Sequence, residues 1–170
     1  MSDRREPPLR PLNLLAVLSR HGVQYVVIGG FSLAAHGYVR GTKHVDIVPQ
    51  PSRANLTRLM KAFEELDAEQ PAVGDFKPEE MPLALDVDGP MQGGNWVLTT
   101  RFGRLDILQD VAGMESYEHL RDRAVVPNVP GLDAAVSFAG RDDLIAMKRA
   151  AGRPQDLQDI AALEAASANY

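Results

Sequence analysis

The chain of 170 residues contains no cysteine, which excludes a disulfide scaffold, thiolate zinc sites, iron–sulfur ligation and a cysteine nucleophile. It also has no surplus of positive charge, because 18 Lys and Arg residues stand against 23 Asp and Glu residues, for a formal net charge of −5. We therefore expect no strong binding to duplex DNA, which requires a broad basic surface. A small basic patch that binds a phosphate remains compatible with this composition.

Long apolar runs are also absent. No segment approaches the roughly 18 consecutive apolar residues that indicate a membrane-spanning helix, and the charged start of the chain does not resemble a signal peptide. We therefore expect a cytoplasmic protein with no membrane partner. The length, with 45% hydrophobic and 24% charged residues, is typical of one globular domain. We assign this domain to residues 11–167, behind a flexible polar tail of residues 1–10.

Apolar patterning predicts alternating helices and strands. Helices are expected at residues 12–18, 31–36, 52–66, 115–123, 142–151 and 154–165. Strands are expected at residues 23–28, 45–48, 96–100, 104–108, 125–126 and 134–138, with the third and fourth forming an antiparallel hairpin. Residues 67–94 are expected to form a loop, with room for one short strand at 83–87. This order predicts an α/β (α+β) fold, a mixed sheet flanked by helices with two C-terminal helices.

Two glycines follow the first predicted strand. Gly29 and Gly30 lead from this strand into a short helix that contains Ser32. Glycine permits positive φ and lets a phosphate approach the backbone, while a helix N-terminus offers free N–H groups. The alternative is a tight turn between strand and helix that binds no ligand.

Three ionisable residues lie on, or directly beside, two further predicted strands. His44 and Asp46 are two residues apart, so their side chains point to the same face of a strand. Asp106 lies inside an apolar run, where a carboxylate is costly unless it is paired or bound to a metal. Carboxylates from neighbouring strands can form an oxygen cage for Mg²⁺. The alternative for Asp106 is a solvent-facing position set by strand alternation.

These residues belong to a series of short motifs. The motifs are Gly29-Gly-Phe-Ser32, Ala35-His-Gly37, Arg40-Gly-Thr42, His44-Val-Asp46, Arg104-Leu-Asp106 and a helical C-terminal motif within residues 143–160. Together they resemble the minimal nucleotidyltransferase superfamily, which is DNA polymerase β-like. More narrowly, they resemble its small bacterial branch, which includes AbiEii-type toxins of toxin–antitoxin systems. The resemblance covers residues 23–163 and implies a nucleotidyltransferase-like mixed sheet.

The resemblance implies a reaction and a set of site residues. The reaction is the transfer of a nucleoside monophosphate from a nucleoside triphosphate to an acceptor hydroxyl, with Mg²⁺ or Mn²⁺ as cofactor and release of pyrophosphate. Asp46 and Asp106 would be catalytic, and Asp106 would also orient or deprotonate the attacking hydroxyl. The metal ligands would be His44, Asp46 and Asp106. The triphosphate would contact Gly29, Gly30, Ser32, Arg40 and Lys148.

The C-terminal helices leave two interpretations open. Lys148 can supply positive charge to the phosphates, with Arg40 as the weaker candidate. Alternatively, Lys148 and Arg149 can lie on a solvated helix face, where they pair with nearby acids or stabilise the helix C-terminus. A structural ion-pair cluster between the last two helices, rather than a catalytic role, is expected for Arg153, Asp156 and Asp159.

Position 44 departs from the family pattern, which has Asp-x-Asp where this chain has His44-Val-Asp46. The loss of one carboxylate forfeits about 4 kcal/mol for a unit charge pair at about 4 Å, or roughly a thousandfold in affinity. Mg²⁺ prefers oxygen ligands, whereas Mn²⁺ or Zn²⁺ accepts imidazole. Either the site uses a softer metal or ordinary catalysis is impaired, and of these two we expect impairment.

Two other features receive structural interpretations. Asp86-Val-Asp88 is a second Asp-x-Asp motif, but it lies in the least regular segment of the chain, and we interpret it as a turn. His36 could contact a nucleotide, but we expect it to bond to carbonyl groups at a helix end.

Three functions remain open from the sequence. The first is an active nucleotidyltransferase, favoured by the glycines, the two aspartates and Lys148. The second is a catalytically impaired nucleotide- or partner-binding protein, favoured by His44. The third, compatible with either, is a toxin or antitoxin subunit with a cognate partner protein. The acceptor and the preferred nucleotide do not follow from the sequence.

Overall fold

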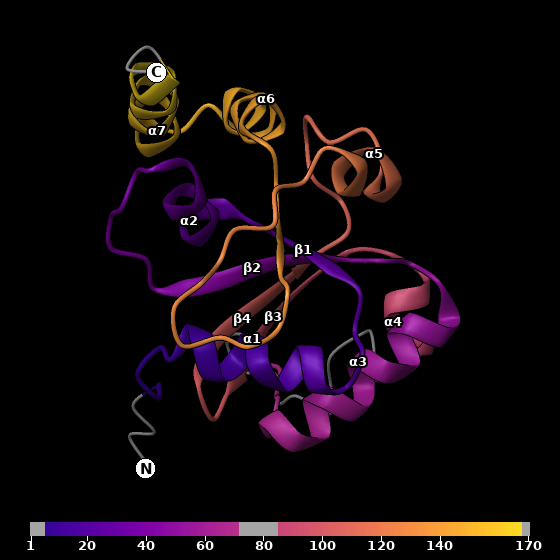
Figure 1. The fold of residues 1–170 in the computed structure, drawn as a ribbon. Helices are drawn as coiled ribbons and strands as arrows, with labels where there is room; N and C mark the ends of the chain where they lie inside the picture. Colours follow the sequence, from indigo (N-terminus) through magenta and orange to yellow (C-terminus); the bar gives the residue numbers. More distant parts are fainter. Residues whose placement is uncertain (1–5, 72–84, 168–170) are drawn as a thin grey trace.

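The computed structural model describes residues 6–71 and 85–167 (Figure 1). Its centre is a five-stranded sheet with the order β3-β4-β2-β1-β5. The strands are β1 (Tyr25–Ile28), β2 (His44–Pro49), β3 (Asn95–Thr100), β4 (Gly103–Leu108) and β5 (Ser137–Phe138). The β1–β2 and β3–β4 pairs are antiparallel, whereas the β2–β4 and β1–β5 pairs are parallel, so the sheet is mixed, as predicted.

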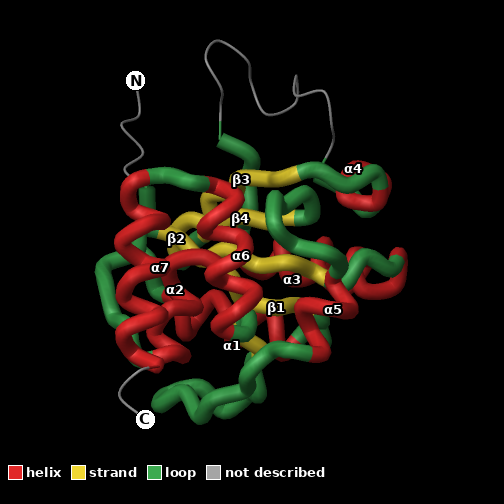
Figure 2. The backbone as a smooth tube through the Cα atoms, turned by 90° about the horizontal axis from the view of Figure 1, so that it is seen from above, coloured by secondary structure: helices red, strands yellow, loops and turns green. Residues whose placement is uncertain are grey.

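Helices cover both faces of the sheet (Figure 1). The first face carries α1 (Pro11–Arg20) and α3 (Arg53–Leu66), with the short α4 (Asp88–Met91) beside α3. The second face carries α2 (Gly29–Ser32), the 3-10 helix η1 (Leu33–His36), α5 (Tyr117–Asp122), α6 (Arg141–Ala151) and α7 (Pro154–Ser167). Seen from above, α6 and α7 lie side by side over the sheet (Figure 2). In the two described ranges, no helix combines the length and the apolar character needed to cross a membrane.

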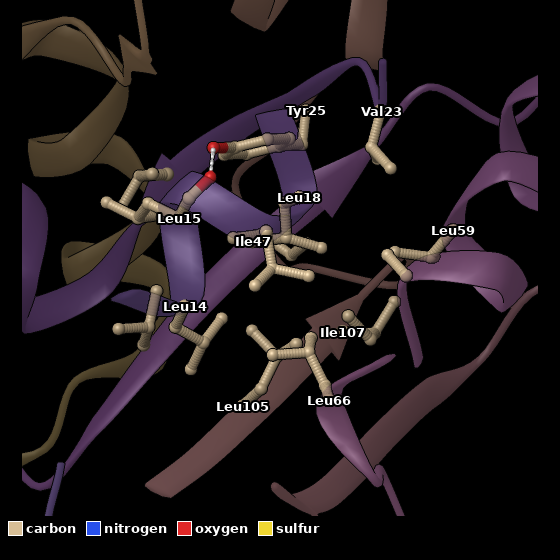
Figure 3. Close-up of a cluster of buried hydrophobic side chains, with 14 of the residues drawn as sticks. Leu14, Leu15, Leu18, Val23, Tyr25, Ile47, Leu59, Leu66, Leu105 and Ile107 are labelled. Carbon is tan, nitrogen blue, oxygen red and sulfur yellow. Dashed lines mark hydrogen bonds between the residues drawn. The ribbon is translucent and has the colours of Figure 1, made fainter. Parts of the chain in front are cut away.

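Side-chain alternation along the strands divides the core into two apolar clusters. Along β1, Tyr25 and Val27 belong to the cluster beneath α1 and α3, whereas Val26 and Ile28 belong to the cluster beneath the C-terminal helices. Figure 3 shows part of the first cluster, where side chains of α1 and α3 pack against β2 and β4: Leu14, Leu15, Leu18, Leu59, Leu66, Ile47, Leu105 and Ile107. Because Val45 and Ile47 point into the first cluster, the side chains at positions 44 and 46 point to the opposite face.

Local signals in the sequence explain where several elements begin and end. The Ser52 hydroxyl accepts a hydrogen bond from the Asn55 N–H and caps the start of α3, as predicted. Gly22 and Gly37 follow α1 and η1 with φ of +69° and +84°, a left-handed backbone that glycine adopts without strain. Gly22 and Gly37 thus end the two helices that precede β1 and β2.

Some predicted elements differ from the structure. Val125 forms only an isolated bridge with Phe138, so the strand predicted at 125–126 is wrong, and the strand predicted at 134–138 shortens to β5. The helix predicted at 31–36 begins earlier, as α2, and continues as a 3-10 helix. The predicted loop at 67–94 contains α4, while most of the remainder, with part of the possible strand at 83–87, lies outside the described residues.

The end of the predicted N-terminal tail packs against the domain. Leu9 contacts the first apolar cluster. The Arg10 N–H donates to the Phe102 carbonyl over 2.9 Å, which joins this segment to the turn between β3 and β4. Residues 9 and 10 therefore contribute to the packing around the hairpin.

Candidate active site

Four charged or titratable side chains lie on adjacent strands at the second face of the sheet. In the parallel pairing of β2 and β4, His44 is opposite Arg104 and Asp46 is opposite Asp106. Each strand contributes two residues with i, i+2 spacing, so all four side chains point to the same face. The strands predicted at 23–28, 45–48 and 104–108 are expected to be neighbours in one sheet, and the order β4-β2-β1 confirms this.

Three of these side chains could together hold a metal ion. One ligand atom from each of His44, Asp46 and Asp106 lies within 4.8 Å of the others. His44 Nε2 is 3.3 Å from Asp46 Oδ2 and 3.9 Å from Asp106 Oδ2. Asp46 and Asp106 are only 8% and 6% exposed, so their carboxylates need a counter-charge. One imidazole and two carboxylates are a donor set that fits Mn²⁺ better than Mg²⁺.

Arg104 already provides a counter-charge to one of these carboxylates. Its Nε and Nη2 donate to Asp106 Oδ1 and Oδ2 over 2.8 and 2.7 Å, a bidentate arrangement. The i, i+2 spacing of Arg104 and Asp106 on a strand indicates that their side chains share a face, and this signal was available in the sequence. The ion pair itself is not among the predicted contacts.

The cations of the site have raised pKa values. The hydrogen bond with Asp46 raises the pKa of His44, and the negative charges of Asp46 and Asp106 act in the same direction, against the opposing effect of burial. The hydrogen bonds to Asp106 likewise raise the pKa of Arg104. Both carboxylates therefore favour the protonated form of the bases that contact them, and a metal ion must compete with a proton at His44.

The proximity of Asp46 requires a glycine at position 29. It has a φ of +71°, and a Cβ at this position would lie 2.1 Å from Asp46 Oδ2. Any side chain at this position would displace the carboxylate. This steric relationship explains Gly29 without a ligand, although it also brings the backbone at the end of β1 to the metal ligands.

Gly30, Ser32 and Arg40 lie next to one another around the turn after β1. The Ser32 side chain is buried, and its hydroxyl donates to the Gly29 carbonyl over 2.6 Å. The Arg40 guanidinium covers Gly30, since a Cβ there would lie 3.2 Å from Arg40 Nη2. The contact of Gly30, Ser32 and Arg40 with a triphosphate stays a prediction.

Lys148 and Arg40 converge on one buried acid. Asp159 is fully buried and accepts hydrogen bonds from Arg40 Nε and Nη2 over 2.9 Å each, and from Lys148 Nζ over 2.8 Å. Burial opposes ionisation of Asp159, but the hydrogen bonds from Arg40, Lys148 and Gln155 lower its pKa overall. Lys148 thus lies in a buried network rather than on a solvated helix face.

Arg153 and Asp156 form a second ion pair beside this network. Arg153 Nε donates to Asp156 Oδ2 over 2.7 Å, and Lys148 Nζ lies 3.8 Å from Asp156 Oδ1. The acids of α7 therefore hold cations of α6, of the turn between the two helices and of the loop before β2. This geometry agrees with the structural cluster expected for Arg153, Asp156 and Asp159.

A cleft of about 290 Å³ connects the metal-ligand group with this network. Gly29, His44, Asp46, Arg104 and Asp106 line it from the sheet, and Lys148, Arg153 and Asp156 line it from the C-terminal helices. Gly30, Ser32 and Arg40 are outside its lining. The cleft therefore joins a predicted metal site to a basic side chain on the opposite wall.

The two features interpreted as structural have protein partners. Asp86 Oδ1 accepts from the N–H groups of Asp88 and Gly89, and Asp88 pairs with Arg53 over 3.0 Å, so this Asp-x-Asp motif forms a turn at the start of α4. His36 Nε2 lies 2.8 Å from the Ala139 carbonyl oxygen. That carbonyl directly follows β5 rather than a helix.

Solved structures resemble the chain in fold, whereas no protein-family model and no curated protein matches it. ANT(2")-Ia in complex with adenylyl-2"-tobramycin has a TM-score of 0.54 at 11% identity, over 88% of this chain and 83% of that chain. The lincosamide antibiotic adenylyltransferase LnuA, bound to lincomycin, has a TM-score of 0.54 at 13% identity, over 92% and 98%. A candidate nucleotidyltransferase from Thermotoga maritima has a TM-score of 0.52 at 13% identity, over 98% and 99%. The chain therefore has a nucleotidyltransferase-like fold.

Proposed function

We propose that the chain binds a nucleoside triphosphate together with a divalent cation and transfers the nucleoside monophosphate to an acceptor hydroxyl. The observation that carries this proposal is the convergence of His44, Asp46 and Asp106 within 4.8 Å in a nucleotidyltransferase-like fold. Lys148, on the opposite wall of the same cleft, supports it with positive charge for the phosphates.

The proposed transfer assigns a role to each carboxylate. The acceptor oxygen attacks the α-phosphorus, the bond from this phosphorus to the bridging oxygen breaks, and pyrophosphate leaves. Asp106 orients the acceptor hydroxyl and takes its proton, and Asp46 and His44 would hold the ion. When bound, the ion would supply positive charge that stabilises the phosphoryl oxygens during transfer. The substitution of His for a carboxylate favours Mn²⁺ over Mg²⁺ at this position.

The acceptor class is open, and the fold neighbours supply one class to test. ANT(2")-Ia is bound to an adenylylated tobramycin, and LnuA is bound to lincomycin. Small molecules that carry hydroxyl groups are therefore rational first acceptors for this chain. A protein acceptor or a cognate partner, as in toxin–antitoxin systems of the AbiEii type, is the second class, supported only by the sequence resemblance.

A second candidate function is nucleotide binding without transfer. Its specific support is the Arg104–Asp106 ion pair, which occupies both oxygens of the proposed base, together with the imidazole at position 44. If this pair persists in the nucleotide complex, Asp106 is a poor proton acceptor and the chain acts as a binding protein.

Calorimetric titration with ATP, CTP, GTP and UTP, first in Mg²⁺ and then in Mn²⁺, tests the proposal. We expect binding of at least one nucleotide, tighter in Mn²⁺, and its loss in Asp46→Asn. The control is Asp88→Asn, which removes an equal charge from an exposed pair on α4 and should bind as the original chain does. Release of pyrophosphate in the presence of an acceptor then separates transfer from binding alone. Absence of nucleotide binding in both metals would contradict both candidate functions.

A further inference from the structure

Arg104 has no role in the chemistry proposed above, yet it holds one of the predicted metal ligands. Its guanidinium engages both oxygens of Asp106, and its side chain lines the same cleft and is 37% exposed. Arg104 is thus anchored at the carboxylate and open to the space where a nucleotide would lie. Such a side chain can exchange one anionic partner for another without a change in the fold.

The charges around the site show why such an exchange would matter. Asp46 and Asp106 contribute two negative charges, Arg104 contributes one positive charge, and His44 is neutral or positive. The group therefore has a net charge of −1 or 0, where two unpaired carboxylates would offer −2. A divalent cation that arrives alone meets a nearly neutral site and an adjacent guanidinium that repels it.

We infer that Arg104 is an internal counter-ion of the metal site, which leaves Asp106 when a metal–triphosphate complex enters the cleft and then binds a phosphate oxygen. This inference rests on the proposed function. The guanidinium fork matches carboxylate and phosphate geometry equally well, so the triphosphate can replace Asp106 as its partner. The metal and the triphosphate then enter together, and each raises the affinity for the other by the same factor.

The test uses Mn²⁺ alone as the first probe, measured by electron paramagnetic resonance of the free ion. Arg104→Gln removes the counter-ion and should bind Mn²⁺ at least about tenfold more tightly than the original chain. Arg153→Gln is the matched control, because it removes the same charge from the same cleft, where its partner is Asp156. It should change Mn²⁺ affinity by less than about threefold, because the Arg153 guanidinium hydrogen-bonds to Asp156 and not to a predicted metal ligand.

The second probe is ATP added with Mn²⁺. In the original chain ATP should raise Mn²⁺ affinity strongly, and in Arg104→Gln the same factor should fall at least about fivefold, because the side chain that links the two ligands is gone. Circular dichroism confirms that each variant is folded. Arg104→Lys keeps the charge but loses the bidentate contact, so it should lie between the original chain and Arg104→Gln, and it carries the same test if the glutamine variant unfolds.

The outcomes separate this inference from the proposed function. If Arg104→Gln, or Arg104→Lys in its place, binds Mn²⁺ no more tightly than the original chain, the counter-ion role is overturned. Tighter Mn²⁺ binding with no ATP binding by any of the proteins supports the counter-ion role and overturns the phosphate contact together with the proposed function. Tighter Mn²⁺ binding with an unchanged effect of ATP overturns the exchange of Arg104 onto phosphate and leaves the proposed function intact.

Discussion

Asp46 on β2 lies directly opposite Asp106 on β4 in the parallel pairing of the two strands. Two residues earlier, the same pairing places His44 opposite Arg104. Two acids and two bases therefore lie on one face of the sheet. The bases are paired with the carboxylates that a metal ion would need as ligands. The site is therefore close to neutral before a ligand enters, and its chemistry depends on which cations can be displaced.

Replacement of His44 by Asp should create a stronger metal site. Three carboxylates would then face the cleft, so we expect His44→Asp to raise the affinity for Mg²⁺–ATP by about tenfold or more, a discounted share of the Coulomb attraction. Without metal, the added repulsion beside Asp46 should lower the melting temperature, and Mg²⁺ should restore it. His44→Asn, which removes the imidazole without adding charge, is the control. A lower melting temperature that Mg²⁺ does not restore, with unchanged nucleotide affinity, would show that position 44 only packs.

Protonation of His44 should contribute stability at low pH. Because the folded chain holds its pKa above the ordinary value of about 6.5, this contribution is fully present below about pH 6.5 and is lost as the pH rises through the folded pKa. The difference in unfolding free energy between the original chain and His44→Asn should therefore shrink upward from about pH 6.5. Urea unfolding at a series of pH values measures it. A difference that is flat or grows with pH would contradict the assigned contact with Asp46.

Substitution by alanine should be more destabilising at Gly29 than at Gly93, a glycine with the same backbone requirement. Gly29 and Gly93 both have positive φ, +71° and +84°, but only at Gly29 would a Cβ meet another group, Asp46. Gly93→Ala should cost about 1–2 kcal/mol, the cost of the left-handed backbone, and Gly29→Ala should cost about 1–3 kcal/mol more. Gly29→Ala should also weaken Mn²⁺ binding by displacing the carboxylate, while Gly93→Ala should not. Equal effects of the two substitutions on stability and metal affinity would remove the steric argument.

Lys148→Ala should affect both stability and nucleotide binding. The substitution removes one charged hydrogen bond from Asp159, which still pairs with Arg40, so we expect a cost of about 1.5–3 kcal/mol of unfolding free energy. If the ammonium also contacts the triphosphate, ATP affinity should fall by the equivalent of about 1.5–3 kcal/mol. Denaturant unfolding and calorimetry measure the two effects separately. Lys61→Ala, at an exposed position of α3, should change neither. A loss of stability with unchanged ATP affinity would restrict Lys148 to the network.

The parts of the site that follow from strand periodicity could be predicted from the sequence. The i, i+2 spacing of His44 and Asp46, and the apolar run around Asp106, indicated two strands whose polar residues share a face. Three short apolar runs that each end in a polar or glycine site residue predicted that these strands are neighbours, and the order β4-β2-β1 confirms it. The predictions for weakly patterned segments were wrong, because the short β5 and the bridge at Val125 depend on pairing with residues distant in the sequence.

The partners of the charged residues could not be predicted in the same way. Arg40 and Asp159 are 119 positions apart and meet only because α7 packs beside the segment that follows β1. Whether Lys148 contacts a phosphate or an acidic side chain of α7 depends on the same packing of α7. The pairing of Arg104 with Asp106 is different, since its spacing was visible, but a strand pattern does not say whether two residues on one face bind each other or a ligand.

The measurement that tests the central claim most directly is a crystal structure with Mn²⁺ and a non-hydrolysable ATP analogue, with anomalous scattering recorded for the metal. We predict an anomalous peak within coordination distance of His44, Asp46 and Asp106, with the triphosphate in the cleft and Arg104 turned from Asp106 to a phosphate oxygen. A structure that shows the nucleotide elsewhere, with no metal at these three side chains and the Arg104–Asp106 pair intact, would contradict the account.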